Sequence, residues 1–300
     1  VDAERNVMQV GLAGLGRMGA ALVPHLRRGS RTLTVWNRTT AKCADAASSG
    51  AHVAQSPAKL TDASEIVLSI LFDDAAVLDT YLGVEGLLAG DCSGRVFVEM
   101  STIKPDTIHE IARVAKERGA SVVDAPVSGT VGPARDGKLL VLAGGSAADV
   151  ARVSPVLSLF ARSIVHLGPT GSGSTMKLAL QLPLYAYWQA LGEALSLGSS
   201  AGLKPADMLS VIGDSPAAIA MLPAKIPMLL GTDTEVAFAL SAALKDLTLI
   251  EETGRRSELR MPFATLVADA YRSATAHNWG DKDVAQLVNY IAQVASAADR

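Results

Sequence analysis

The stretch Val10-Gly11-Leu12-Ala13-Gly14-Leu15-Gly16-Arg17-Met18-Gly19 decides the fold of this chain. It joins a short apolar run, residues 7–13, to an amphipathic segment that reaches Arg28, and this order predicts a strand, a tight turn and a helix. In the spacing Gly-x-Gly-x-x-Gly, the first glycine permits the turn, the second lets a pyrophosphate approach the backbone, and the third lets helix and strand pack closely. The start of the helix then offers free N–H groups and a positive dipole end to phosphates.

This context predicts a dinucleotide site, the alternative being a glycine turn that serves packing alone. The residues expected to contact the dinucleotide are consecutive: Gly14, Leu15, Gly16, Arg17 and Met18.

The end of the second predicted strand, Trp36-Asn37-Arg38-Thr39, indicates which dinucleotide binds. An NAD site usually has an acidic residue at this strand end, about 20 residues after the glycine motif. That residue bonds the ribose 2′-hydroxyl. This chain has no carboxylate at that point to repel a 2′-phosphate. Arg38 can form charge-assisted bonds to the phosphate, and Asn37 and Thr39 can donate hydrogen bonds. We therefore predict NADPH in contact with Asn37, Arg38 and Thr39; the alternative is that Arg38 is a solvated surface charge.

Two domains are predicted from the change of pattern along the chain. Apolar strand-like runs alternate with helix-length segments in the first half, which predicts a parallel sheet with helices on both faces. The expected strands are 7–13, 33–36, 65–71, 96–99, 122–124, 139–143 and 164–167, with a helix at 105–118. From about Ser174 the pattern is helical, with helices expected at 174–201, 205–212, 238–255, 262–277 and 283–298. We predict an α/β N-terminal domain, residues 1–167, and an all-α C-terminal domain, residues 168–300.

Composition excludes several functional classes. The chain has 300 residues, of which 49% are hydrophobic and 19% charged, so it can bury a large core and is not a disordered protein. A net charge of −3 argues against a nucleic-acid partner held by bulk positive charge. The five histidines are dispersed, so no metal site is expected. Neither a targeting segment nor an apolar run long enough for a membrane is visible, and the two isolated cysteines, Cys43 and Cys92, suit the reducing cytoplasm.

Four segments of the chain resemble the β-hydroxyacid dehydrogenase family, which includes 3-hydroxyisobutyrate dehydrogenases and tartronate semialdehyde reductases. They are residues 10–19, Asp124-Ala125-Pro126-Val127-Ser128-Gly129-Thr130, Gly171-Ser172-Gly173-Ser174-Thr175-Met176-Lys177 and Lys245-Asp246-Leu247. The resemblance implies a Rossmann-type N-terminal domain and covers nearly the whole chain. The related imine reductases share the fold and the Trp-Asn-Arg-Thr type of strand end but generally lack the lysine, so Lys177 favours the hydroxyacid branch.

The resemblance implies a catalytic role for Lys177 as the general acid in carbonyl reduction and, deprotonated, as the base in oxidation. A lysine near a nicotinamide cation and partly desolvated can have its pKa lowered toward the working range. Ser128 and Gly129 follow a predicted strand at the carboxyl edge of the sheet, where they can bind a carboxylate or carbonyl oxygen. Thr130 stands where the family usually has a second glycine, which adds a side chain beside the predicted substrate pocket.

Gln181 lies four residues after Lys177, on the same face of a predicted helix, where the family frequently has asparagine. It is predicted to hold the substrate or orient Lys177, or else to bond to a neighbouring helix. The remaining cofactor contacts implied by the resemblance and by the sheet edge are Leu71, Phe72, Thr102 and Lys245; for Lys245 the alternative is a surface charge.

Aromatic residues gather just beyond Gln181 in a chain that has few of them. Pro183 is expected to kink the helix, and Tyr185, Tyr187 and Trp188 follow it. These rings are interpreted as packing a subunit interface; the alternative is that one ring forms a wall of the active site and suits a bulkier substrate.

The leading hypothesis is an NADPH-dependent oxidoreductase that transfers hydride reversibly between NADP(H) and a small 3-hydroxy acid, with its semialdehyde or ketone as the oxidised partner. One alternative is an NADPH-dependent imine reductase or reductive aminase on the same scaffold. A second alternative is a nucleotide-binding protein without catalysis. The long apolar helices predict a homodimer with interleaved helical domains, and a cleft between sheet domain and helical domain is expected to hold the small-molecule carbonyl or imine substrate.

Overall fold

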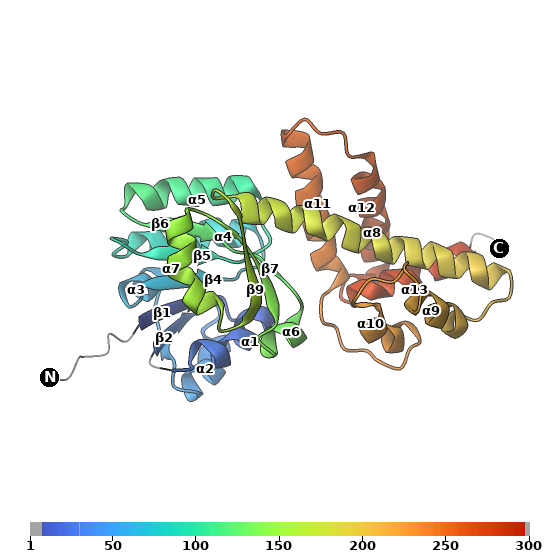
Figure 1. Cartoon of the computed structure of the whole chain (residues 1–300), viewed down its shortest axis with the longest axis horizontal. Coiled ribbons are helices and arrows are strands. Elements are labelled where there is room, and N and C mark those ends of the chain that lie inside the picture. Colours follow the sequence, from blue (N-terminus) through green and yellow to red (C-terminus); the bar gives the residue numbers. More distant parts are fainter. Residues whose placement is uncertain (1–7, 30, 298–300) are drawn as a thin grey trace. The chain divides into compact units, whose positions relative to one another are not determined.

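The computed structural model describes residues 8–29 and 31–297 (Figure 1). It forms two compact units: the first ends at Lys177 and the second begins at Leu178. The sequence boundary at 167 falls at the last strand of the sheet, which ends at Gly168. The start of the next helix still belongs to the first unit, because a carboxylate of the sheet binds two of its backbone N–H groups.

The first unit, which we call the sheet unit, contains one sheet of nine strands among the described residues. The strands are β1 (Met8–Ala13), β2 (Arg31–Trp36), β3 (His52–Val53), β4 (Ile66–Ser69), β5 (Val96–Glu99), β6 (Ser121–Asp124), β7 (Val127–Ser128), β8 (Leu139–Gly144) and β9 (Ala161–Gly168). From β3 through β2, β1, β4 and β5 to β6 all pairs are parallel. The fold-class prediction is confirmed.

The far end of the sheet differs from the parallel arrangement that the sequence predicts. Strand β8 runs antiparallel to both β6 and β7 and pairs in parallel with β9. The reason is the short connection between β7 and β8, residues 129–138: parallel neighbours need a crossover of about a dozen or more residues, whereas antiparallel neighbours do not. The reversal places the segment 124–128 at the edge where β6 ends and β7 begins.

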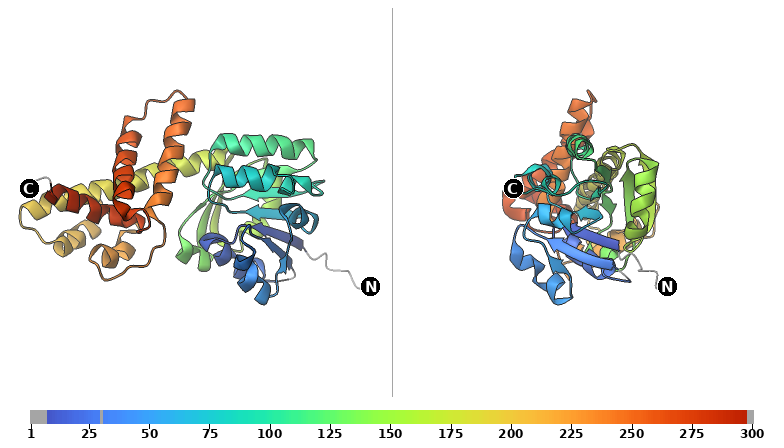
Figure 2. Two further views of the ribbon diagram at one scale, coloured as in Figure 1. Left: turned by 180° about the vertical axis from the view of Figure 1, so that it is seen from behind. Right: turned by 90° about the vertical axis from the view of Figure 1, so that its left-hand side faces the viewer.

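Helices cover both faces of the sheet (Figures 1 and 2). They are α1 (Arg17–Leu26), α2 (Ala44–Ser48), α3 (Pro57–Asp62), α4 (Asp74–Leu82), α5 (Pro105–Glu117), α6 (Val131–Arg135) and α7 (Ala147–Leu157). In β4, Ile66 and Leu68 enter one apolar core with residues of α1 and α7, whereas Val67 enters a second core with residues of α3, α4 and α5. Alternation along each strand therefore separates the two cores and fixes which side chains face which layer.

The second unit, which we call the helical unit, is built on the long helix α8 (Ser172–Ser200), whose first residues belong to the sheet unit. The other helices are α9 (Pro205–Gly213), α10 (Leu222–Leu229), α11 (Leu240–Arg256), α12 (Pro262–Ala274) and α13 (Leu287–Ala297). Helices α11 and α12 lie side by side (Figure 2). Helix α12 stops before the predicted residue 277, because Asn278 has φ +66° and the segment 275–279 forms a π-type turn.

The aromatic cluster packs inside this unit. Tyr185 and Trp188 are fully buried in its core, together with Tyr271. Helix α8 remains one helix through Pro183. None of the described helices has both the length and the apolar character that a membrane span requires.

Candidate active site

The glycine turn after β1 has the geometry of a phosphate cradle. Gly14 adopts φ +97°, and a Cβ there would lie 2.2 Å from the Ile70 carbonyl oxygen. A Cβ on Gly19 would lie 1.9 Å from the Gly14 carbonyl oxygen, so only glycine lets helix and strand approach this closely. A Cβ on Gly16 would meet nothing within 4 Å, so this side of the backbone is open to a ligand. Each glycine thus has the geometry that its predicted role requires.

The first turn of α1 leaves its N–H groups to a ligand. Gly16 is the N-cap, and no side chain caps the helix. Arg17 is exposed and Met18 half-buried at this end of the helix. Leu15 N donates to Asn37 Oδ1 at 2.8 Å, which ties the glycine turn to the end of β2. These residues fit a dinucleotide pyrophosphate at the helix N-terminus.

The segment after β2 offers fewer donors than the sequence predicts. Asn37 Nδ2 donates to the Thr39 carbonyl at 2.9 Å, so one of its two amide hydrogens is already used. Asn37 therefore positions the glycine turn and has one hydrogen left for a phosphate. The side chains of Arg38 and Thr39 are exposed, and Arg38 forms no ion pair with any residue of the described part of the chain.

A buried carboxylate joins the loops that follow β4 and β5. Glu99 is fully buried, and its Oε1 accepts from Ser101 N at 2.7 Å. Its other oxygen accepts a short hydrogen bond from the Ser69 hydroxyl, which lies 2.7 Å from the Tyr81 hydroxyl. Ser101 Oγ in turn accepts from Leu71 N at 2.7 Å. Glu99 therefore holds together the two loops that carry predicted cofactor contacts.

Those predicted contacts lie at the carboxyl edge of the sheet. Leu71 is half-buried, Phe72 is 63% exposed and Thr102 is half-buried. In a parallel sheet this edge is where ligands bind.

Burial raises the pKa of Glu99 from its usual 4.5 to about 7. The hydrogen bonds from Ser101 and Ser69 oppose this change because they favour the ionised form, but they do not cancel the desolvation.

Asp124, at the end of β6, anchors the start of α8. Its two carboxylate oxygens accept from Gly171 N and Ser174 N, each at 2.7 Å. Gly173 allows this approach, because a Cβ there would lie 2.2 Å from the Leu142 carbonyl oxygen. Burial raises the pKa of Asp124, and the two backbone N–H groups lower it. A buried carboxylate at a helix N-terminus also benefits from the helix dipole.

The anchored helix delivers Lys177 to the predicted substrate segment. Lys177 is buried, and its Nζ donates to the Val127 carbonyl oxygen at 2.9 Å. Ser128, the next residue, is half-buried, Gly129 is exposed with φ +129°, and Thr130 is half-buried. The structure therefore brings together Lys177 and the segment 128–130, which are about 50 residues apart in the chain.

A polar network in the helical unit contains Gln181, Tyr185, Asp246 and Lys245. Gln181 Nε2 donates to Asp246 Oδ2 at 2.9 Å and to the Tyr185 hydroxyl at 2.5 Å. The Tyr185 hydroxyl donates to the same Asp246 oxygen at 2.6 Å. Lys245 Nζ lies 2.9 Å from Asp246 Oδ1. Lys245 is thus paired with a buried carboxylate and is not an isolated surface charge.

For three acidic residues of these networks, the sequence predicts no role. Asp124 and Asp246 lie in segments that resemble the family, and Glu99 ends an apolar strand. An acidic residue within or directly after a run that is predicted to be buried is the signal that could have found all three, because a buried charge needs partners.

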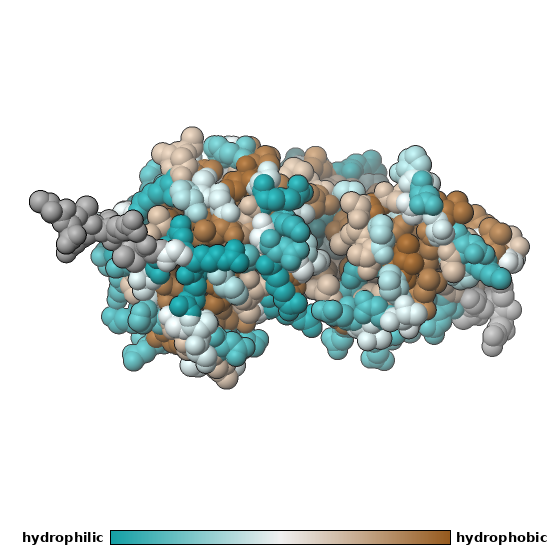
Figure 3. Space-filling model, turned by 60° about the horizontal axis from the view of Figure 1, so that its bottom comes forward, coloured by the Kyte–Doolittle hydropathy of each residue, from teal (hydrophilic) through white to brown (hydrophobic). Residues whose placement is uncertain are grey.

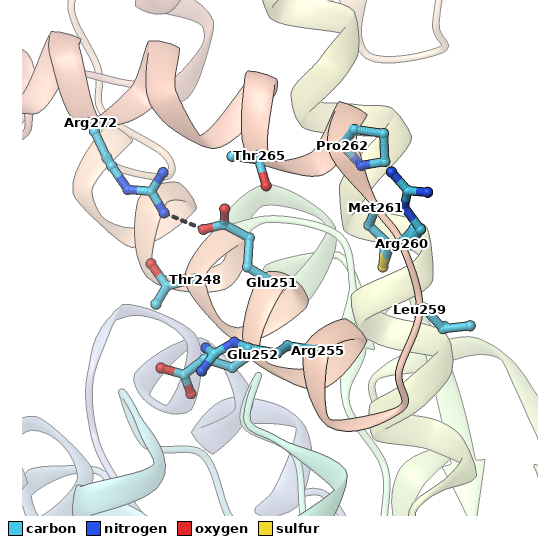
Figure 4. A pocket seen from close by; sticks show the side chains of 10 residues that line it. All are labelled: Thr248, Glu251, Glu252, Arg255, Leu259, Arg260, Met261, Pro262, Thr265 and Arg272. Carbon is cyan, nitrogen blue, oxygen red and sulfur yellow. Dashed lines mark hydrogen bonds and ion pairs between the residues drawn. The ribbon is translucent and has the colours of Figure 1, made fainter.

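A pocket of about 640 Å³ lies on the helical unit and contains none of the predicted site residues (Figure 4). Its lining comes from the second half of α11, the following loop and α12, and is mostly charged or polar: Thr248, Glu251, Glu252, Arg255, Leu259, Arg260, Met261, Pro262, Thr265 and Arg272. Arg272 is paired with Glu251 across it. We assign it no ligand, because it contains none of the predicted site residues and its Arg272 already pairs with Glu251.

Comparison with known proteins identifies the family. Residues 9–168, more than half of the chain, match the family described as the NAD binding domain of 6-phosphogluconate dehydrogenase. Residues 171–291 match the NAD-binding domain of NADP-dependent 3-hydroxyisobutyrate dehydrogenase. The chain belongs to the β-hydroxyacid dehydrogenase family. Binding of NAD(P) and the oxidoreductase class follow from this membership.

Individual β-hydroxyacid dehydrogenases resemble the chain over nearly its whole length. It is 30% identical to glyoxylate/succinic semialdehyde reductase 1 of Arabidopsis thaliana over 95% of this chain and 98% of the relative. It is also 30% identical to 2-(hydroxymethyl)glutarate dehydrogenase of Eubacterium barkeri over 97% of each. The solved structure of Mycobacterium tuberculosis 3-hydroxyisobutyrate dehydrogenase with L-serine has a TM-score of 0.85 and 25% identity, over 95% of this chain and 99% of that one.

A solved reductive aminase has a lower TM-score with this β-hydroxyacid dehydrogenase, at similar sequence identity. A reductive aminase from Aspergillus terreus, solved with NADPH, cyclohexanone and allyl amine, has a TM-score of 0.61 and 26% identity, over 95% of this chain and 99% of that one. The predicted relation to imine reductases is confirmed, and the lower TM-score makes their activity the less favoured alternative.

Replacing Glu99 by glutamine is expected to stabilise the protein at alkaline pH. Because the folded-state pKa is raised, the stability that Glu99 contributes is fully present below pH 4.5 and is lost as the pH rises through about 7. The loss amounts to about 3 kcal/mol above pH 8. Glutamine stays neutral and can still accept from Ser101 N and donate to Ser69. Glu99→Gln therefore avoids this loss of stability.

Thermal unfolding of both proteins between pH 5 and pH 9 measures this effect. The melting temperature of Glu99→Gln is expected to exceed that of the wild type by a margin that grows up to about pH 8. Glu110→Gln, an exposed position on α5, is the control. A constant difference across this range would contradict the assignment of Glu99 as the titrating group.

Proposed function

We propose that this protein catalyses reversible hydride transfer between NADP(H) and a small 3-hydroxy acid, with its semialdehyde or ketone as the oxidised partner. One observation carries the proposal: the Lys177 ammonium is buried and donates to the Val127 carbonyl, directly beside Ser128. A proton donor held at the end of a substrate-binding segment is what carbonyl reduction requires in addition to the hydride. The nicotinamide supplies the hydride when the cofactor is bound.

The chain's own residues have distinct roles in this proposal. In reduction, Lys177 Nζ donates a proton to the oxygen of the substrate carbonyl, and in oxidation the neutral amine takes the proton from the hydroxyl. The bond to Val127 fixes where the ammonium lies, so little entropy is lost when the substrate arrives. The Ser128 hydroxyl and the N–H group of Gly129 hold the substrate carboxylate. Asp124 acts through the start of α8 and keeps Lys177 in place.

The names of the relatives support a small hydroxy acid as the substrate, and 2-(hydroxymethyl)glutarate is a 3-hydroxy acid. Succinic semialdehyde and glyoxylate carry a carboxylate and an aldehyde, and 2-(hydroxymethyl)glutarate carries a hydroxymethyl group beside a carboxylate. All three pair a reacting C–O centre with an acid group within a few bonds. Thr130 adds a side chain next to Ser128 and Gly129 and restricts the size of the substrate.

NADP(H) is preferred over NAD(H) in this proposal because of the end of β2. The exposed Arg38 guanidinium has no carboxylate partner among the described residues and is available to a 2′-phosphate. Asn37 and Thr39 flank it with a remaining amide hydrogen and a hydroxyl.

Lys177→Ala is expected to lower kcat by about 100- to 10,000-fold, because the developing alkoxide loses its proton donor. The dissociation constant of NADPH is expected to stay within about twofold, since Lys177 is assigned to proton transfer. Steady-state kinetics with NADPH and a panel of semialdehydes, ketones and cyclic imines measure kcat, and fluorescence titration measures NADPH binding. Lys138→Ala, an exposed lysine paired with Asp136, is the control.

Three outcomes would contradict the proposal. Full activity of Lys177→Ala would remove its catalytic role. Turnover of imines alone would favour the imine reductase alternative. Tight NADPH binding without turnover of any compound would favour a nucleotide-binding protein without catalysis.

Arg38→Ala is expected to lower the ratio of kcat/KM for NADPH over NADH by about 10- to 100-fold, the effect of losing a charge-assisted bond to the 2′-phosphate. The change should fall on NADPH and leave NADH nearly unaffected. Arg113→Ala on α5, which removes an exposed arginine paired with Glu117, serves as the control. An unchanged ratio would show that Arg38 is a surface charge only.

We also propose that the protein is a homodimer formed through the helical unit. This unit exposes large apolar side chains on several helices, and Figure 3 shows apolar (brown) side chains reaching its surface. The most exposed of these are Leu197, Leu203, Val211, Leu259, Phe263 and Leu266. Light scattering of the purified chain is expected to give twice the mass of one chain, and Val211→Lys is expected to shift it toward the monomer. A monomeric wild type at micromolar concentration would contradict the dimer.

A further inference from the structure

The buried Glu99 carboxylate ends a hydrogen-bond chain that has two arrangements. Its second oxygen meets the Ser69 hydroxyl, which also lies 2.7 Å from the Tyr81 hydroxyl and 3.5 Å from the Val98 carbonyl oxygen. When Glu99 is ionised, Tyr81 donates to Ser69 and Ser69 donates to Glu99. When Glu99 is protonated, its own O–H group donates to Ser69, and Ser69 turns its proton to the Val98 carbonyl. The fold therefore accommodates Glu99 with and without its proton.

The charge on Glu99 acts on the loops that carry predicted cofactor contacts. Glu99 Oε1 accepts from Ser101 N at 2.7 Å, and Ser101 Oγ accepts from Leu71 N at 2.7 Å. A backbone N–H group binds a carboxylate more strongly than a neutral carboxyl group. Ionisation therefore strengthens the bond that holds both loops, and it places a negative charge three residues before Thr102.

No cation neutralises this charge in the part of the chain that the structure describes. Glu99 is fully buried, and its pKa of about 7 results mainly from desolvation opposed by hydrogen bonds from Ser101 and Ser69. No charged side chain is among the main causes of this value. A cation that binds at this edge of the sheet therefore lowers the pKa of Glu99 and displaces its proton.

Other titratable groups lie on the elements around this face of β5. Helix α7 covers the opposite face, where Val96 and Val98 point. Burial raises the pKa of Tyr81 well above its usual range, so its hydroxyl stays neutral. The titratable groups on this face and in its loops are Asp73 and Asp74 after β4, Tyr81 on α4, Lys104 and His109 at α5, and Asp124 on β6.

We propose that Glu99 is a positioning residue that favours the cationic, oxidised nicotinamide when it is ionised, so that binding of NADP⁺ releases the Glu99 proton to solvent and binding of NADPH does not. The two redox forms differ by one positive charge on the nicotinamide ring, whereas their phosphates are the same. Glu99 acts through Ser101 and Leu71 and through its charge. This inference rests on the proposed function and on its cofactor contacts at Leu71 and Thr102.

The ratio of two dissociation constants, Kd for NADPH over Kd for NADP⁺, isolates the nicotinamide charge, because the phosphates titrate alike in both. Calorimetric titration of the purified protein between pH 6 and pH 9 measures both constants. For the wild type, the ratio is expected to rise about tenfold over this range, with a midpoint near pH 7. Glu99→Gln keeps the size and the bond from Ser101 N but carries no charge, so its ratio is expected to change by less than about twofold.

Four further variants separate Glu99 from its neighbours. Ser69→Ala removes a hydrogen bond that favours the ionised form and is expected to move the midpoint to higher pH. His109→Gln keeps a donor for the Thr170 carbonyl, 3.0 Å from His109 Nε2, and Lys177→Ala removes the buried ammonium. Both variants are expected to keep the tenfold rise, as is the exposed control Glu110→Gln.

Proton release provides a measure that does not depend on affinity. Titrations at pH 7 in two buffers with different ionisation enthalpies give the number of protons released on binding. NADP⁺ is expected to release about half a proton more than NADPH from the wild type, and the same number as NADPH from Glu99→Gln.

The outcomes separate this inference from the proposed function. A wild-type ratio that stays constant from pH 6 to pH 9, or a rise that Glu99→Gln retains, overturns the inference alone. If the wild type binds only NAD(H), the ratio for NADH over NAD⁺ decides, since these differ by the same charge. Failure to bind either pair overturns the proposed function and this inference with it. Melting temperatures show whether Glu99→Gln folds; if it does not, an unchanged midpoint for Ser69→Ala overturns the inference.

Discussion

The candidate site depends on the bond between the Asp124 carboxylate and the start of α8. Two backbone N–H groups, from Gly171 and Ser174, converge on this one side chain at the end of β6. The bond converts a flexible glycine-rich segment into a fixed helix start, and Lys177 then reaches Val127 at the neighbouring strand edge. The hydrogen bond to the Val127 carbonyl offsets part of the cost of burying the lysine.

A second buried carboxylate, on the neighbouring strand, also binds loop backbone. Glu99 and Asp124 are register partners on β5 and β6, and Ser69 is the register partner of Glu99 on β4. Each of these polar residues ends a strand and directly follows buried apolar residues. Asp124 binds the helix that carries the predicted catalytic lysine, whereas Glu99 binds the loops that carry predicted cofactor contacts. The carboxyl edge of the sheet is thus organised by buried side chains that accept hydrogen bonds from loop backbone and not from solvent.

A third buried carboxylate, Asp246, organises the helical unit by the same principle with different partners. Its Oδ2 accepts from the side chains of Tyr185 and Gln181, and its Oδ1 forms an ion pair with Lys245. A side-chain amide or hydroxyl can donate or accept, and its neighbours in the network decide which it does. The Tyr185 ring therefore belongs to a polar network as well as to the apolar core. The interpretation that these rings pack a subunit interface is therefore wrong for Tyr185 and Trp188, which are fully buried in the core of their own chain.

The sequence by itself determined the fold class, the glycine turn, the family and the position of Lys177. These depend on local patterns: strand and helix periodicity, glycine spacing and short motifs, all of which are visible within a few residues. The sequence did not predict the two-residue strands β3 and β7 or the antiparallel end of the sheet, because so short a strand has no periodicity. Only the tertiary structure decided the partners of the buried polar groups. Asp124 with Gly171, Lys177 with Val127 and Gln181 with Asp246 are 47, 50 and 65 residues apart, and no local pattern specifies which distant group satisfies a buried charge. The direction of the Gln181 amide is the clearest case, since it follows from a carboxylate that accepts and a tyrosine that donates only once the fold has placed them together.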